Sequence, residues 1–374
     1  MMKANPLKTV GTFGQSIWLD YIRRDLITSG QLRRLIEEDG LRGMTSNPSI
    51  FEKAIVGSHE YDEDIRTMVR EGKGVETIYE TLSQRDVQSA ADEFRSLYDE
   101  TGGRDGYVSL EVNPHLAHDT KGTVEEAHRL WRMLARPNVF IKVPATTEGL
   151  SAIQELITEG INVNVTLLFG LPRYRQVADA YLSGLATRAA RGKPVAHVAS
   201  VASFFVSRID GLVDPLLEKA ILHGGEKADL AKTLHGRVAI ASAKMAYQLY
   251  KEIFGSGRFQ SLAEQGARVQ RLLWASTSTK SPHESDVKYV EALIGADTVN
   301  TAPLETLDAY RDHGDPKARL EQDVGEARSA LERLPELDIN IDQVTQQLED
   351  DGVVKFNTPF DKLMQTLAGT SPRL

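Results

Sequence analysis

Short apolar runs rich in β-branched residues alternate along the chain with longer stretches whose apolar positions recur at helical spacing. The short runs predict strands at residues 16–22, 43–47, 107–112, 139–144, 162–169, 197–205, 271–277 and 298–302. Charged, periodic stretches such as 124–136, 172–190 and 227–254 lie between them. Strands separated by helix-length connections indicate a parallel sheet, because each parallel crossover needs about a dozen residues or more.

Eight strand–helix units are the number that closes a (β/α)8 TIM barrel. Several runs are apolar on both faces, as expected for strands whose outer side is covered by helices. The connections 48–106 and 206–270 are long enough to carry extra inserted helices. We therefore expect one barrel domain over residues 1–374, with the barrel at about 16–315 and a C-terminal helical extension at about 316–374. An open doubly wound sheet is the alternative, but no glycine-rich dinucleotide motif or P-loop follows any strand.

The end of the chain carries the signals of a short terminal helix in the stretch NTPFDKLMQTLAG. Thr358 can serve as the N-cap, Pro359 as the first helical residue and Gly369 as the C-terminal stop. We expect this helix to begin at Pro359.

Composition removes several classes of function. The chain has 374 residues with a net charge of -9, which argues against a nucleic-acid or anionic-membrane surface. It has no cysteine, so thiolate catalysis, disulfides and cysteine-bound zinc are excluded. The N-terminus lacks the apolar core of a signal peptide, and no uninterrupted apolar run approaches the length of a membrane span. A cytoplasmic protein is expected.

Lys142 stands in the apolar run VFIKVP, where a buried strand is expected. Lysine is almost never buried without a partner, because moving an ammonium group out of water is costly. One interpretation is a side chain that reaches back to solvent, or one half of a structural ion pair. The other is a nucleophile, because burial disfavours the ammonium form and a free amine can form a Schiff base with a carbonyl.

Polar residues stand at the carboxyl ends of most predicted strands, where barrel enzymes carry their functional groups. They are Asp20, Asn47, Glu111, Lys142, Asn164, Thr166, Ser203 and Ser276. Each carboxylate alone could be a structural ion-pair partner. Two carboxylates that converge on a buried lysine suit a stepwise carbonyl reaction better, because each step of that reaction moves a proton.

Two further features give weaker signals. His115 and His118 follow the third strand at helical i,i+3 spacing, so a zinc-type aldolase is a competing hypothesis, although no third histidine stands at a strand end. Arg208, in FFVSRID, could pair with Asp210 or Asp214, or it could bind a phosphate at a helix start.

Several of these segments resemble the transaldolase family. GMTSNPSIF (43–51) resembles its first signature, and VFIKVPATTEGLSAI (139–153) resembles the second, which surrounds the Schiff-base lysine. SLEVNPHLAHD, INVNVTLLFG and SFFVSRID resemble the family's third, fifth and sixth strand segments, in the same order. LWASTSTKSP and DTVNTAPLETLDAY resemble the longer bacterial subgroup. The resemblance covers residues 16 to about 302 and implies a class I aldolase barrel with no cofactor and no metal.

The resemblance also implies a role for each strand-end residue. Lys142 would attack C2 of a ketose phosphate such as fructose 6-phosphate or sedoheptulose 7-phosphate. Asp20 would take the C4 hydroxyl proton, and Glu111 would act with a water in forming and hydrolysing the imine. The residues implied to hold the dihydroxyacetone unit and the catalytic water are Asn47, Asn164, Thr166 and Ser203. Arg208 and Ser276 would contact phosphate. A glyceraldehyde 3-phosphate or erythrose 4-phosphate acceptor places the reaction in the non-oxidative pentose phosphate pathway.

The sequence departs from the shorter transaldolases at the phosphate site. A second phosphate-binding arginine of that group corresponds to Ser278 here, and Lys280 is expected to replace it as a point charge. Three rival functions stay open: an aldolase of the same fold that releases free dihydroxyacetone, a metal-dependent aldolase, and a barrel that only binds phosphosugars. The releasing relatives carry tyrosine at the position of Phe205, which favours transfer. A monomer or a homodimer is expected.

Overall fold

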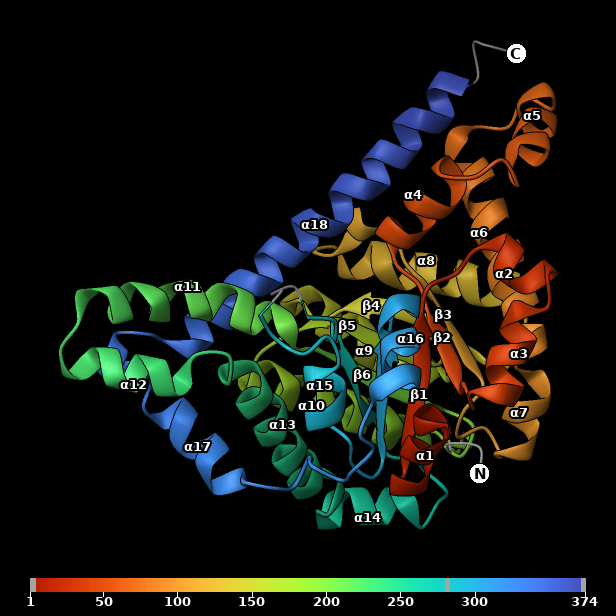
Figure 1. The fold of residues 1–374 in the computed structure, drawn as a ribbon. Coiled ribbons are helices and arrows are strands. Elements are labelled where there is room, and N and C mark those ends of the chain that lie inside the picture. The colour runs from red at the N-terminus through yellow and green to blue at the C-terminus, as the bar shows by residue number, and fades with distance from the viewer. Residues whose placement is uncertain (1–4, 280–282, 371–374) are drawn as a thin grey trace.

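The eight predicted runs form eight parallel strands that close into a barrel in the order β1 to β8 (Figure 1). This computed structural model describes residues 5–279 and 283–370. The strands of that part of the chain are β1 (Gln15–Asp20), β2 (Gly43–Thr45), β3 (Tyr107–Glu111), β4 (Val139–Pro144), β5 (Val163–Leu168), β6 (Ser200–Phe205), β7 (Arg271–Ala275) and β8 (Thr298–Ala302). β8 pairs with β1, so no strand is left at an edge. The (β/α)8 barrel prediction is confirmed.

The helices surround the barrel, as Figure 1 shows, and the long connections hold the extra ones. The elements before β5 are α1 (Pro6–Val10), η1 (Gly11–Phe13), α2 (Arg24–Thr28), α3 (Gln31–Glu38), α4 (Pro48–Val56), α5 (Asp62–Arg70), α6 (Val75–Glu93), α7 (Arg95–Glu100), η2 (Pro114–Leu116), α8 (Thr120–Leu134) and α9 (Thr147–Glu159). Those after it are α10 (Leu171–Ala190), α11 (Ser207–His223), α12 (Glu226–Leu234), α13 (Val238–Phe254), α14 (Gly257–Ala263), α15 (Lys288–Ala292), α16 (Leu304–His313), α17 (Val324–Glu332), η3 (Leu334–Leu337) and α18 (Ile341–Thr370).

The periodic stretch 227–254 forms two helices, α12 and α13. Gly236 lies between them with a φ of 68°, in the left-handed region that favours glycine. Its backbone N–H donates to the carboxylate of Asp214 at 2.8 Å. The chain therefore turns at Gly236, although the apolar spacing continues on both sides.

Aromatic side chains fill the barrel interior one layer below the polar strand ends. The rings of Tyr107 and Phe140 stack with centroids 4.3 Å apart, and Trp18 lies 6.1 Å from Phe140. Gly43 leaves room for the indole, because a Cβ there would lie 2.6 Å from the Trp18 ring. Side chains two residues apart share a face of a strand, so this layer supports the residues that follow it in β1, β3 and β4.

The prediction for the C-terminal helix is wrong at its start. α18 is one helix over Ile341–Thr370, with Pro359 in its interior and Gly369 within its last turn. The Thr358 hydroxyl donates to the Val354 carbonyl at 3.0 Å, one turn back, and so does not cap a helix start. A long buried stripe explains the continuity: Val344, Leu348, Val353, Phe356, Phe360, Leu363 and Leu367 are all buried. Tertiary packing of such a stripe outweighs the local cost of a proline.

α18 lies across the end of the barrel at which the strands finish, running from α11 to α4 (Figure 1). It approaches β5 closely at Gly352, where a Cβ would lie 2.9 Å from the Leu167 side chain. Leu167 has a φ of 54°, and the pairing of β5 with β6 shifts register between Val165 and Leu168. This bulge in β5 and the glycine in α18 therefore meet at the mouth of the barrel.

None of the helices in the described ranges has the length and apolar character needed to cross a membrane.

We predict that Pro359→Ala stabilises the protein by about 1–3 kcal/mol, since alanine restores an N–H for the Lys355 carbonyl inside a helix. The free energy of unfolding in urea measures this, and Thr358→Ala is the control in the same turn. A helix that began at Pro359 would give the opposite result: little change for Pro359→Ala and a loss of about 1 kcal/mol for the N-cap variant Thr358→Ala.

Candidate active site

Lys142 lies inside the barrel at β4, with 4% of its surface exposed. Its Nζ donates to the Ser46 carbonyl at 3.1 Å and lies 3.7 Å from Oε2 of Glu111. Glu111 and Lys142 are register partners on neighbouring strands, and Asn164 is the next partner along, so the three side chains point to the same side. The lysine is buried and paired, and it does not reach back to solvent.

Glu111 is a carboxyl group held where ionisation is unfavourable. Burial raises its pKa from an ordinary 4.5 to about 7, although the positive charge of Lys142 works against this shift. Among the described residues, no hydrogen-bond donor reaches either of its carboxylate oxygens. A group with a pKa near neutrality can give and take a proton at the pH of the cell, which suits an acid and base in one reaction.

Asp20 ends β1 on the same side of the barrel. The Thr45 hydroxyl donates to its Oδ1 at 2.6 Å, and the Thr45 and Thr301 hydroxyls lie 2.8 Å apart. Burial raises the pKa of Asp20, and the charges of Lys142 and Arg208 oppose that rise. Both cations are therefore close enough to act on this carboxylate.

A chain of hydrogen bonds fixes the polar residues on the other side of Lys142. Ser203 donates to Oδ1 of Asn164 at 2.6 Å, and Nδ2 of Asn164 donates to the Ser109 hydroxyl at 3.0 Å. The Thr166 hydroxyl, two residues beyond Asn164, is fully buried and has no partner among the described residues. Buried polar groups are nearly always satisfied, so an orphaned hydroxyl here is free to bind a substrate group or a water.

Asn47 has a structural role that its side chain must keep. It is the N-cap of α4, and its Oδ1 accepts from the Ile50 N–H at 3.0 Å. The side-chain amide has two N–H groups besides that oxygen, which remain available for a ligand.

Arg208 does not form either ion pair considered from the sequence. Asp210 accepts instead from the Ala239 N–H and the Tyr289 hydroxyl, and Asp214 accepts from the Gly236 N–H. Within the described ranges, the buried Nη1 of Arg208 has no hydrogen-bond partner, and its guanidinium lies 5.0 Å from the Phe205 ring centroid. Burial lowers the pKa of Arg208. The guanidinium group of Arg208 thus lies in the site with N–H donors that are not used by the described residues.

Ser276 follows β7 with a φ of 56°, a strained conformation for a residue with a side chain. Its carbonyl accepts from the Ser207 N–H at 3.0 Å, which joins the end of β7 to the start of α11 and to Arg208. The structure thus brings Ser276 beside the helix that carries Arg208. Lys280 lies outside the described residues.

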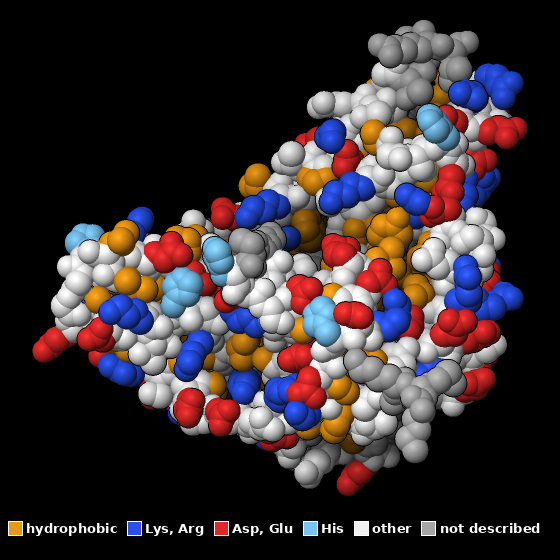
Figure 2. All heavy atoms as spheres, in the orientation of Figure 1, with side chains coloured by type: hydrophobic (Ala, Val, Ile, Leu, Met, Phe, Trp, Pro, Cys, Tyr) orange, Lys and Arg blue, Asp and Glu red, His pale blue; other side chains and the backbone are white. Residues whose placement is uncertain are grey.

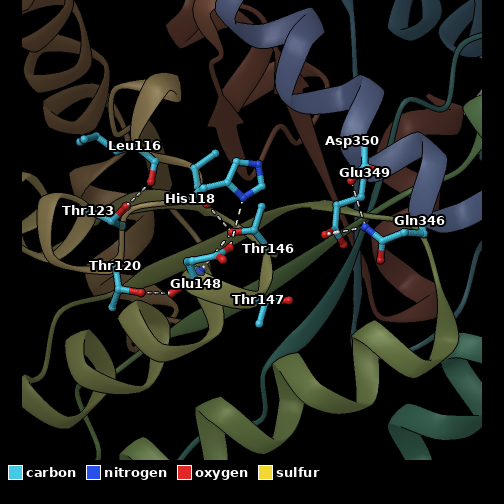
Figure 3. A network of polar contacts seen from close by, with 12 residues as sticks. Leu116, His118, Thr120, Thr123, Thr146, Thr147, Glu148, Gln346, Glu349 and Asp350 are labelled. Carbon is cyan, nitrogen blue, oxygen red and sulfur yellow. Dashed lines mark hydrogen bonds and ion pairs between the residues drawn. The ribbon is translucent and has the colours of Figure 1, made fainter.

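His115 and His118 contact carboxylates on different elements. Nε2 of His115 lies 2.7 Å from Oδ1 of Asp361 on α18, and Nδ1 of His118 lies 3.1 Å from Oε2 of Glu148 at the start of α9. Figure 3 shows His118 turned toward Glu148. No cluster of three or more metal-ligating side chains occurs in residues 5–279 and 283–370.

Sequence reasoning missed three residues that complete the surroundings of Lys142. Ser46 and Thr45 lie inside the run GMTSN, and only their position one and two residues before Asn47 pointed to the site. Phe356 comes from α18, and its ring centroid lies 5.7 Å from Nζ of Lys142. No local signal in the tail pointed to Phe356, because its place depends on how α18 crosses the barrel.

The arrangement suits imine chemistry. A buried amine lies beside a carboxyl group of near-neutral pKa, and a second carboxyl group faces the same space. An amine can attack a carbonyl carbon, and the two carboxyl groups can move the protons that imine formation and carbon–carbon cleavage require.

Comparisons with known proteins find matches over almost the whole chain. The family model described as Transaldolase/Fructose-6-phosphate aldolase matches residues 17–367. A protein named Transaldolase from Trichodesmium erythraeum is 48% identical over 370 residues, which cover 98% of this chain and 97% of the relative. Transaldolase 2 from Nostoc sp. is 48% identical over 373 residues, 98% of each chain. A protein named Transaldolase from Thiobacillus denitrificans is 47% identical over 360 residues, 96% of this chain and 99% of the relative.

The raised pKa of Glu111 predicts how stability depends on pH. The native state holds this proton more tightly than the unfolded state does, so the stability that Glu111 contributes is complete below about pH 4.5 and is lost as the pH rises to about 7. Glu111→Gln removes that titration. In urea unfolding, the variant should therefore gain on the wild type between these pH values and keep a constant difference above them.

Glu148→Gln is the control, because the pKa of Glu148 is lowered and its titration lies below this window. Parallel stability curves for the wild type and Glu111→Gln across the window would contradict the burial of a carboxyl group at this position.

Proposed function

This chain belongs to the transaldolase/fructose-6-phosphate aldolase family, and we propose that it transfers a dihydroxyacetone unit between sugar phosphates through a Schiff base on Lys142. The observation that carries the proposal is the buried amine of Lys142, 3.7 Å from a carboxyl group whose pKa burial raises to about 7. A structural ion pair needs no such poised carboxyl group, whereas imine chemistry does.

The reaction begins with attack of the Lys142 amine on C2 of a ketose phosphate. Glu111 and a water held near the free hydroxyl of Thr166 move the protons as the carbinolamine loses water. Asp20 then takes the C4 hydroxyl proton, the C3–C4 bond breaks, and an aldose phosphate leaves. The electrons of that bond remain as an enamine on Lys142. The enamine carbon attacks the aldehyde of the acceptor, Asp20 returns the proton, and water releases the product.

The remaining site residues hold the substrate. Asn164 and Ser203 form a fixed pair that can bind hydroxyl groups of the dihydroxyacetone unit, and Asn47 offers amide N–H groups from the start of α4. Arg208, Ser276 and, from the sequence, Lys280 bind the phosphate. The donor is sedoheptulose 7-phosphate or fructose 6-phosphate, and the acceptor is glyceraldehyde 3-phosphate or erythrose 4-phosphate.

Transfer is favoured over simple release of dihydroxyacetone. The three relatives described above are named as transaldolases, and the wall beside Ser203 is apolar, because the Phe205 ring contacts Phe169 with centroids 5.2 Å apart. We propose in addition that the protein acts in the cytoplasm, as part of the pentose phosphate pathway, as a monomer or homodimer. The packing of α18 on α4 and β5 supports the proposal that residues 1–374 form one domain.

Borohydride reduction tests the mechanism. Treatment with fructose 6-phosphate should leave a stable adduct, which peptide mass mapping places on Lys142, and Lys142→Ala should lose both the adduct and all activity. Lys244→Ala is the matched control, because Lys244 is also buried but donates to the Gln322 carbonyl away from the barrel interior. An active enzyme that forms no adduct, or an adduct on another lysine, would rule out this mechanism. A requirement for erythrose 4-phosphate then distinguishes transfer from cleavage.

Arg208→Lys tests the phosphate site. A lysine keeps the charge but loses the two-pronged geometry, so KM for fructose 6-phosphate should rise about tenfold while kcat changes less. Unphosphorylated fructose is the control donor, because its KM should not depend on Arg208. An equal rise in KM for both donors would show that Arg208 only supports the structure.

A further inference from the structure

Phe356 is an apolar side chain in the immediate surroundings of Lys142, and it belongs to an element outside the barrel. The other groups near Nζ are polar: the carbonyl of Ser46 and the carboxylate of Glu111. Phe356 is 4% exposed, and so is wedged between α18 and the barrel. The catalytic amine therefore has a polar side, which faces Glu111, and an apolar side, which is closed by α18.

Contacts on both sides of Phe356 fix its place. Before it, the Arg173 fork holds both oxygens of Glu349, at 2.9 and 3.1 Å, and both side chains are largely buried. Figure 3 shows Glu349 beside Gln346 on α18. Between Glu349 and Phe356, Gly352 sets how closely the helix approaches the β5 bulge.

After Phe356, Asp361 pairs with His115, and Lys362 donates to Glu52 on α4 at 2.6 Å. Figure 2 shows a recess in this face, beside the part of α18 that crosses the barrel, with hydrophobic side chains at its bottom. Side-chain ion pairs thus connect α18 to three separate elements near the barrel mouth, and Phe356 lies between these contacts along the helix.

From this placement, we infer that Phe356 is a specificity-determining residue: it keeps water away from the enamine on Lys142, so that the bound three-carbon unit waits for an aldose acceptor. This inference rests on the transfer reaction proposed above. The competing outcome is release of dihydroxyacetone. In that side reaction the enamine carbon C3 takes a proton, which replaces the one that left the C4 hydroxyl, and one water then hydrolyses the imine to dihydroxyacetone and the free amine.

Protonation of C3 is the step that commits the enamine to release, because the hydrolysis that follows uses the same water that ends each normal turnover. Solvent near the enamine supplies that proton, whereas attack on an aldehyde needs only the acceptor. Excluding water is a general way to protect a reactive intermediate from hydrolysis and protonation. Glu111 and Thr166 lie on the polar side and can still guide the one water that ends each turnover. An apolar ring on the other side removes further water without removing that one.

The test is the product ratio of Phe356→Ala with fructose 6-phosphate as donor. Free dihydroxyacetone is compared with sedoheptulose 7-phosphate formed from erythrose 4-phosphate, and the ratio should rise roughly tenfold over the wild type, on the scale by which apolar contacts change specificity. Phe356→Leu keeps much of the apolar volume, so it should fold like the wild type and give a smaller rise in the same direction.

Phe360→Ala is the matched control. Phe360 is one turn further along α18, is also buried, and packs on the rings of Tyr79 and His115 instead of on Lys142. Its truncation should lower stability and leave the product ratio unchanged. The inference is overturned if the Phe356 variants form the Lys142 adduct but keep the wild-type ratio, or if Phe360→Ala changes the ratio equally. A wild type that forms no adduct would instead overturn the proposed function.

Discussion

The burial of one lysine side chain opposite one carboxyl group is the constraint on which this site depends. An unpaired charge inside a protein costs several kcal/mol, and a buried pair repays its loss of water only when its surroundings hold it in place. Here the register of β3 with β4 places Glu111 directly beside Lys142, and the Ser46 carbonyl accepts a hydrogen bond from Nζ of Lys142. Burial raises the pKa of Glu111 to about 7, and the charge of Lys142, 3.7 Å away, offsets only part of that rise.

The layers of the barrel make that arrangement rigid. Side chains two residues apart on a strand point to the same side. Asp20 therefore lies one layer above Trp18, and Lys142 one layer above Phe140. On β3, Ser109 and then Glu111 follow Tyr107 on the same side. The aromatic layer packs tightly, and the absence of a side chain at Gly43 makes room for the Trp18 indole. The polar layer therefore rests on apolar side chains. α18 supplies an apolar roof at Phe356. The amine is therefore enclosed above and below, and polar groups reach it only from the sides.

The sequence allowed most of the barrel to be predicted, because strand–helix alternation and residues such as Asp20, Glu111 and Lys142 at strand ends are local patterns. What failed depends on contacts between distant segments. Proline and glycine signals indicated a helix from Pro359 to Gly369, whereas α18 begins at Ile341 and the packing of its buried stripe carries it through Pro359. Spacing alone could not show whether Arg208 pairs with Asp210. The groups that bind Asp210 instead, the Tyr289 hydroxyl and the Ala239 N–H, come from other elements. Phe356 reaches Lys142 only through the path of α18.

The path of α18 is set more by shape than by charge. His115 and Asp361 are both about half exposed and Lys362 is largely exposed, and ion pairs of such side chains contribute about 0–1 kcal/mol. The Arg173–Glu349 pair is more buried, but the cost of desolvation offsets part of its attraction, and burial accordingly raises the pKa of Glu349. The buried stripe supplies the larger share of the binding, and the fit of Gly352 against Leu167 fixes the depth. A helix held in this way fixes the distance between the Phe356 ring and Nζ of Lys142 at 5.7 Å. At that distance, as inferred above, an apolar ring can exclude water from one side of the amine and leave the side that faces Glu111 open.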